Sequence, residues 1–188
     1  ATLVLAVGAG YLIGGIRSAL VIAALTLFIA LSPWWDRALV TLYMATFGVV
    51  VSCLIGFTVG TLSFQNKKSA AFMLGVCDIF QTFPSFVYLI PVMMLFGITD
   101  TSVLIAVIVY ATIPATRYTI EGLRSVPVGL HEAATMSGVN KFQRLTKIEF
   151  PLAFPHMMLG LNQTIVFALF MVIIGAFIGT EDLGQYIL

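Results

Sequence analysis

The sequence predicts an all-α integral membrane protein, a single transmembrane domain over residues 1–188, and three observations support this. Of the 188 residues, 60% are hydrophobic and 9% are charged, with a mean hydropathy of +1.08, whereas a soluble domain is about 25% charged. The uncharged runs are long and do not alternate between polar and apolar residues, which excludes a transmembrane barrel with strands of roughly 10 residues. The chain is also too short to hold both these runs and a soluble catalytic domain.

Charged residues divide the chain into six expected spans, since a helix needs roughly 20 apolar residues to cross a bilayer. The first span ends at Arg17. The second finishes on Trp34 and Trp35, which are typical of the membrane interface. The third contains Gly56 and Gly60 at GxxxG spacing, which lets two helices approach closely. The expected spans are residues 1–16, 18–35, 38–63, 70–97, 101–116 and 153–179.

Basic residues indicate the orientation, because Lys and Arg near span ends stay on the cytoplasmic side. If the loop at 117–152 is cytoplasmic, every basic residue except Arg37 lies on the same side. The opposite orientation would place all of them outside. The residues on the cytoplasmic side are then Arg17, Lys67, Lys68, Arg117, Arg124, Lys141, Arg144 and Lys147.

The loop at 117–152 is long for a connection between spans, and long ordered loops are usually functional. Pro127 is suited to open a helix there, and Gly138 is suited to close it in the left-handed conformation. A second short helical segment is expected over Lys141 to Ile148. On physical grounds alone, this region could equally be an amphipathic helix lying on lipid headgroups. The first helix would carry a stripe of small residues formed by Leu130, Ala133, Ala134 and Ser137.

The spacing of residues in this loop resembles a known motif. Glu132, Ala133 and Ala134 are followed by three residues, Gly138, nine residues, and then Ile148, Glu149, Phe150 and Pro151. This resembles the EAA loop of ABC importer permeases, with Phe150 where that pattern has Leu. The resemblance implies a type I importer fold whose EAA helix docks on an ATPase subunit. We expect Glu132 and Gly138 to act in coupling, although both could merely cap a helix.

Three further stretches make the resemblance more specific. Residues 81–97, residues 151–173 and the ending DLGQYIL are similar to permeases for glycine betaine, proline betaine and related osmoprotectants. The resemblance implies a bacterial inner-membrane subunit that works with a second permease copy, two ATPase subunits and an external binding protein. Its substrate class includes glycine betaine, proline betaine, choline, carnitine and trimethylamine N-oxide. By the family pattern one more span would follow Leu188, so the chain looks like part of a longer protein.

The sequence contains no Gly-Lys dipeptide and therefore no phosphate-binding P-loop. ATP and Mg are consequently expected on the partner ATPase, and this chain is expected to bind no cofactor. His131 to Thr135 begins like the zinc motif HExxH but has Thr135 in place of the second His. Cys53 and Cys77 lie in apolar runs and are read as small core residues. A net charge of +1 does not indicate a nucleic-acid surface.

Polar residues inside the fourth and sixth spans are candidates for a translocation pathway, because such groups normally face protein or water. Pro84 frees a helix carbonyl that Thr82 or Ser85 could bind. The same groups could instead join helices through hydrogen bonds, and Asp78 could be hydrated near the cytoplasmic surface. The candidates are Asp78, Gln81, Thr82, Pro84, Ser85, Asn162 and Gln163.

Three other functions remain as alternatives. The chain could be an importer permease for another small polar solute. A secondary transporter or channel would need no ATPase, but it often has a broken helix in each of two halves, and only Pro84 offers such a break. An intramembrane enzyme is a weaker alternative, because no paired carboxylates, Ser/His pair or metal cluster lies at matched depth.

Overall fold

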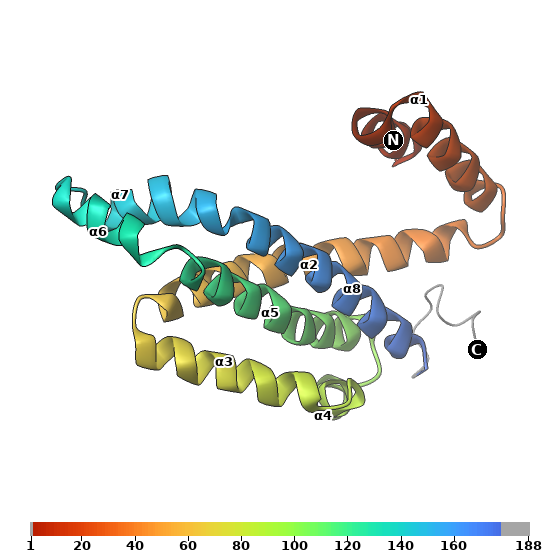
Figure 1. The fold of residues 1–188 in the computed structure, drawn as a ribbon. Helices are drawn as coiled ribbons and strands as arrows, with labels where there is room; N and C mark the ends of the chain where they lie inside the picture. Colours follow the sequence, from red (N-terminus) through yellow and green to blue (C-terminus); the bar gives the residue numbers. More distant parts are fainter. Residues whose placement is uncertain (1, 178–188) are drawn as a thin grey trace.

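The computed structural model describes residues 2–177, and within this range the chain is helical with no β-strand (Figure 1). The expected end of the last span, at 178–179, and the DLGQYIL segment lie outside the described residues. The elements are α1 (Thr2–Ala30), α2 (Trp35–Phe64), α3 (Lys67–Thr82), α4 (Phe86–Phe96), α5 (Asp100–Arg124), α6 (Val128–Met136), α7 (Lys141–Arg144), the π-helix η1 (Leu145–Glu149) and α8 (Phe150–Ala176).

Helix α5 is the centre of the bundle. It packs along its length against α2 and α8, while α3 and α4 lie against it at the other side (Figure 1). Val103, Ala106, Ala111 and Leu123 of α5 are fully buried. Helix α1 contacts little besides the start of α2, and the short helices α6 and α7 project at the opposite end of the bundle.

Small residues allow α2 and α5 to lie this close, as the GxxxG spacing predicts. A methyl group at Gly56 would come within 2.4 Å of the Ala115 Cβ, and one at Gly60 within 2.7 Å of the Thr119 Cβ. Such separations are below van der Waals contact, so both positions require glycine. Because apolar surface gains little by leaving lipid for protein, close packing of this kind holds membrane helices together.

The first two expected spans correspond to two helices within residues 2–30, and the break between them lies at Gly14 and Gly15, slightly before the expected boundary at Arg17. Gly15 has φ +69°, a left-handed conformation that glycine adopts without strain. A charge shows where the chain meets polar surroundings, but it does not end a helix. Trp34 and Trp35 lie at the turn into α2 instead of closing a span.

The fourth expected span is a bent pair, in which α3 and α4 meet at 88°. The bend follows from Pro84, since the residue before a proline is pushed out of the helical conformation, and Phe83 is extended at φ −75°, ψ 138°. Thr82 Oγ1 donates to the Ile79 carbonyl at 2.7 Å, and the Tyr88 hydroxyl from α4 donates to the Phe80 carbonyl. The carbonyl that Pro84 frees, four residues back at Phe80, is therefore bound by Tyr88 and not by Thr82 or Ser85 as expected, and Thr82 binds the neighbouring Ile79 carbonyl.

The fifth span is longer than 101–116, because α5 continues to Arg124. The segment between α5 and α8 therefore begins at Ser125, and Arg117 belongs to a helix instead of the loop. Among the described residues, three helices are long and apolar enough to cross a membrane, or four if the bent pair counts as one span. The apolar helix Gly14–Ala30 is shorter than these.

Gly60→Ala should destabilise the protein by about 1–3 kcal/mol, because the added methyl group overlaps Thr119 in a close-packed interface. The midpoint of thermal unfolding in detergent measures this. Gly75→Ala on α3 is the matched control, since its methyl group would meet no atom within 4 Å and should stabilise the helix by roughly 0.5–1 kcal/mol. Equal midpoints for the two variants would contradict this account of α2–α5 packing.

Candidate functional site

The loop helix α6 begins and ends as the sequence predicts. Pro127 occupies the N-cap position at φ −58°, ψ 135°. Gly138 follows the helix at φ +71°, with its N–H donating to the Thr135 carbonyl and the Val139 N–H donating to the Ala134 carbonyl, each at 3.1 Å. These two bonds form a Schellman motif. A side chain at Gly138 would meet no atom within 4 Å. Glycine is therefore required here by the left-handed backbone conformation and not by a lack of space.

Helix α6 turns one face to the bundle and the other outward. Ala134 is buried, whereas Glu132 and Ala133 are exposed and Met136 is 90% exposed. Glu132 makes no hydrogen bond or ion pair with any described residue. The expected stripe of small residues is therefore split between the two faces, because only Ala134 of that stripe is buried. The outward face is available to a partner.

The return from α6 to the bundle is one continuous helical run of α7, η1 and α8. Asn140 and Gln143 form a capping box at its start. The Phe150 N–H bonds to the Leu145 carbonyl, five residues back, and this wider π turn comes just before Pro151, which lacks an N–H and crowds the preceding turn. Ile148 is half-buried in the π turn and Pro151 is exposed. The Ile148–Pro151 end of the motif therefore shapes the entry into α8.

Glu149, a motif residue without an expected role, is 2% exposed in the π turn. Its Oε1 lies 3.1 Å from His131 Nδ1 of α6 and 2.9 Å from Arg144 Nε of α7. Sequence reasoning treated His131 only as part of a failed zinc motif. The sequence did place the Glu149 carboxylate in the same polar loop as several basic residues. Which of them it contacts depends on how the loop folds.

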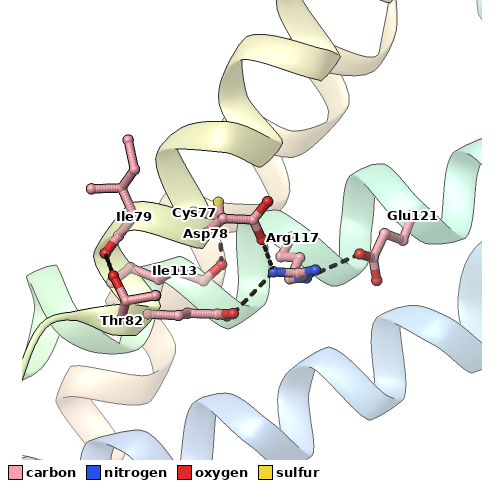
Figure 2. A network of polar contacts seen from close by, with 8 residues as sticks. Cys77, Asp78, Ile79, Thr82, Ile113, Arg117 and Glu121 are labelled. Atoms are coloured by element: carbon pink, nitrogen blue, oxygen red, sulfur yellow. Dashed lines mark hydrogen bonds and ion pairs between the residues drawn. The ribbon is translucent and has the colours of Figure 1, made fainter.

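A second polar cluster joins α3 to α5 (Figure 2). Arg117 pairs with Asp78 and donates to Gln81 Oε1 at 3.0 Å, and its Nε donates to Glu121 Oε1 at 3.0 Å. The polar residues at 78 and 81 therefore meet a cation that the sequence analysis had placed in the loop. The Arg117–Glu121 spacing of four residues was a local sign that the helix continues.

This network borders a cavity of about 570 Å³ between α3, α5 and α8, lined by Gln81, Pro114, Arg117, Tyr118, Glu121, Gln163 and Phe167. Gln81 and Gln163 were predicted to face a common pathway, and the structure brings them to one cavity. Asn162 is exposed beside Gln163 and does not line the cavity. Thr82, Pro84 and Ser85 lie at the α3–α4 bend and likewise do not line it.

No group of three or more His, Cys, Asp or Glu side chains that could hold a metal ion occurs in the described part of the chain. Cys53 and Cys77 are buried free thiols on different helices. The Cys77 Sγ lies 3.8 Å from the Ile113 carbonyl of α5. Both cysteines thus take part in helix packing.

The fold and the loop together define a class of multi-pass helical membrane protein that carries a glycine-closed helix outside its bundle. Residues 48–188 match the family model described as binding-protein-dependent transport system inner membrane component, and the chain belongs to this family. The resemblance expected from the EAA spacing is confirmed. The chain therefore belongs to the ABC importer permease family, whose members are multi-pass components of the inner membrane.

The chain is similar to three curated relatives. It is 89% identical to the trimethylamine N-oxide transport system permease protein TmoV of Pelagibacter ubique, over 100% of this chain and 26% of the relative. It is 49% identical to TmoV of Ruegeria pomeroyi, over 94% of this chain and 27% of the relative. It is 38% identical to the glycine betaine/proline betaine transport system permease protein ProW of Escherichia coli, over 82% of this chain and 44% of the relative. The chain thus spans about a quarter of the TmoV relatives.

A solved structure of the MetNI methionine ABC transporter, in an inward-facing conformation, matches with a TM-score of 0.69 at 22% identity. The match covers 80% of this chain and 76% of that one. This likeness shows the fold, which is that of a type I ABC importer permease.

Gln81→Cys and Gln163→Cys should react with a water-soluble thiol reagent, because both side chains line the cavity. The experiment uses a background in which Cys53 and Cys77 are Ser, with labelling followed by mass shift. Leu159→Cys, on an exposed apolar position of α8, is the control and should react at least tenfold more slowly in membranes. Labelling of Leu159→Cys as fast as the two cavity positions would contradict a water-filled cavity.

Proposed function

We propose that this chain is the transmembrane subunit of an ATP-driven importer that moves a small methylated-ammonium or N-oxide osmolyte across the bacterial inner membrane. The observation that carries this is the exposed face of α6, with Glu132 and Ala133 outward and the helix closed at Gly138. A helix that is capped, projecting and unpaired on one side is suited to bind a partner protein. Family membership indicates that the partner is an ABC ATPase.

The proposed assembly places the catalysis outside this chain. Two ATPase subunits would bind ATP and Mg, and each would receive the α6 helix of one permease copy. A second copy of this chain would complete the pathway, and an external binding protein would deliver the substrate. Arg124 of α5 contacts the Lys67 carbonyl at 3.4 Å, so both basic residues lie at the α6 end of the bundle. Because basic residues near span ends stay in the cytoplasm, this charge pattern supports a cytoplasmic α6. Membrane lipid would cover the exposed apolar side chains of α2, α4 and α8.

Trimethylamine N-oxide is the first substrate we propose, because two relatives named as permeases of trimethylamine N-oxide transport systems are 89% and 49% identical to this chain. Glycine betaine, proline betaine, choline and carnitine are the related candidates. The network beside the cavity has two carboxylates, Asp78 and Glu121, against one guanidinium, Arg117. A net negative network favours the cationic methylammonium end of such a molecule.

The proposed mechanism is alternating access. ATP binding would close the ATPase dimer and move the docked α6 helices, and this would shift the equilibrium between inward- and outward-facing arrangements of the spans. A partner shifts such an equilibrium only by its difference in affinity for the two states. Asp78, Gln81, Thr82, Pro84, Ser85, Asn162 and Gln163 remain the proposed pathway residues, with Gln81 and Gln163 best placed by the cavity.

Uptake of labelled trimethylamine N-oxide into proteoliposomes should require the binding protein and internal ATP, and it should survive collapse of ion gradients. Co-purification of an ATPase with the tagged permease in mild detergent is the accompanying measurement. Uptake that persists without ATP and stops with the ion gradient would show a secondary transporter instead. ATP-driven uptake of an unrelated solute, with none of the osmolytes, would refute only the substrate assignment.

Gly138→Val should reduce ATPase co-purification and uptake about tenfold, because a non-glycine residue in the left-handed conformation costs roughly 1–2 kcal/mol and the end of α6 would change shape. Gly138→Asn is the matched variant, since Asn tolerates this conformation, and it should keep most of the activity. If both variants behaved alike, the backbone at Gly138 would not be what positions α6.

A further inference from the structure

Glu149 is the only charged side chain that is fully buried among the residues whose burial the structure describes. Removing an isolated carboxylate from water is strongly unfavourable, so a buried one needs basic or hydrogen-bonding partners. Here both partners meet the same oxygen, with His131 Nδ1 at 3.1 Å and Arg144 Nε at 2.9 Å from Oε1. The position of this carboxylate therefore depends on two other segments of the chain.

The two partners differ in what they connect. Arg144 belongs to α7, which continues directly into η1 and α8, so its contact stays within one helical run. His131 belongs to α6, which is separated from that run by the turn at Gly138. The His131–Glu149 pair is consequently the side-chain contact that joins the loop helix α6 to the buried carboxylate just before α8.

Little else holds α6 to the bundle. No described helix makes an extended contact with α6, and Ala134 is its buried side chain. A cavity of about 400 Å³ adjoins the pair, lined by Phe64, Gln65, His131, Lys141, Phe142, Arg144, Leu145 and Glu149. Because a cavity adjoins His131 and Glu149, close side-chain packing does not hold α6 in place at this point, and the contact between the two residues has to do so.

The atoms that meet at this carboxylate are themselves buried. Arg144 Nε and Glu149 Oε1 are shielded from water, and neither has a partner in hydrogen-bond alignment, although both lie at ion-pair distance. The Glu149 carboxylate oxygen therefore depends on the approach of the His131 and Arg144 nitrogens. Glu149 also closes a π turn, a feature that occurs frequently at functional sites.

We propose that Glu149 is a positioning residue that ties α6 to α8 through His131, so that the two helices move as one unit. This inference rests on the proposed function for its consequence, which is that force from a docked ATPase passes through Glu149 into α8. With the tie removed, α6 would still dock, but its displacement would not reach the spans.

The first test needs no ATPase. Spin labels at Met136 on α6 and Leu159 on α8, in a background with Cys53 and Cys77 replaced by Ser, report the distance between the two helices in detergent. Glu149→Gln should broaden the distance distribution at least twofold, and Lys147→Gln, an exposed charge in the same π turn, should leave it unchanged. A Glu149→Gln distribution as narrow as that of the parent would overturn the tie.

The second test uses the assembled transporter without labels. Glu149→Gln should retain ATPase co-purification and basal hydrolysis while the ATP consumed per substrate imported rises about tenfold. His131→Gln should behave similarly, and His131→Lys, which places an ammonium donor at 131, should restore much of the coupling. An unchanged ratio in Glu149→Gln would overturn the role of the tie in coupling.

The outcomes separate this inference from the proposed function. Broadened distances in a transporter whose parent form shows no ATP-driven uptake would refute the proposed function and support the tie. If Glu149→Gln does not fold, His131→Gln removes the tie from the α6 side while Arg144 still pairs with the buried carboxylate. Normal distances and normal coupling in His131→Gln would then overturn the inference.

Discussion

The close approach of α5 to α2 and α8 is the constraint on which the rest of the structure depends. Apolar side chains gain little by moving from lipid into protein, so these helices are held by contact at short range. Gly56 and Gly60 admit α5 on one side, and Gly160 of α8 lies against Tyr118 on the other, where a methyl group would come within 2.8 Å of the Tyr118 Cβ. With both flanks of α5 closed in this way, the polar side chains of Arg117 and Glu121 are directed to the remaining face, where α3 and the cavity lie.

Features that depend on local sequence could be predicted. The GxxxG spacing predicted the α2 interface, and Gly138 predicted the left-handed end of α6, because each signal is contained in a few neighbouring residues. Features that depend on which segments meet could not be predicted. The Arg117 network joins positions 39 residues apart, and the Glu149 contact with His131 depends on the turn between α6 and α7. The residues of both contacts were singled out in the sequence, but the contacts between them were not predicted.

The incorrect span boundaries have a different cause. The prediction places helix ends at charged residues, but a helix satisfies its own backbone hydrogen bonds and continues past a charge that finds a partner. Arg117 is such a charge, since Asp78 and Glu121 pair with it inside the bundle. Glycine and proline mark the breaks more reliably here, because Gly15 takes a positive φ and Pro84 excludes the helical conformation at Phe83. Composition therefore predicted the class of fold better than it predicted where the helices begin and end.

Helix α8 joins the two polar clusters into one mechanical element. Glu149 lies immediately before α8 and Gln163 lies within it, 14 residues further along, which corresponds to roughly 21 Å at about 1.5 Å per residue. The helix is packed on α5 between these points, through Ala153, Met157 and Gly160, and Pro155 removes one of its internal hydrogen bonds there. A displacement imposed on Glu149 by α6 would then pass along α8 towards Gln163 and change the cavity that Gln163 shares with Gln81 and Arg117. In such an arrangement the polar loop needs no contact with the solute to control its passage.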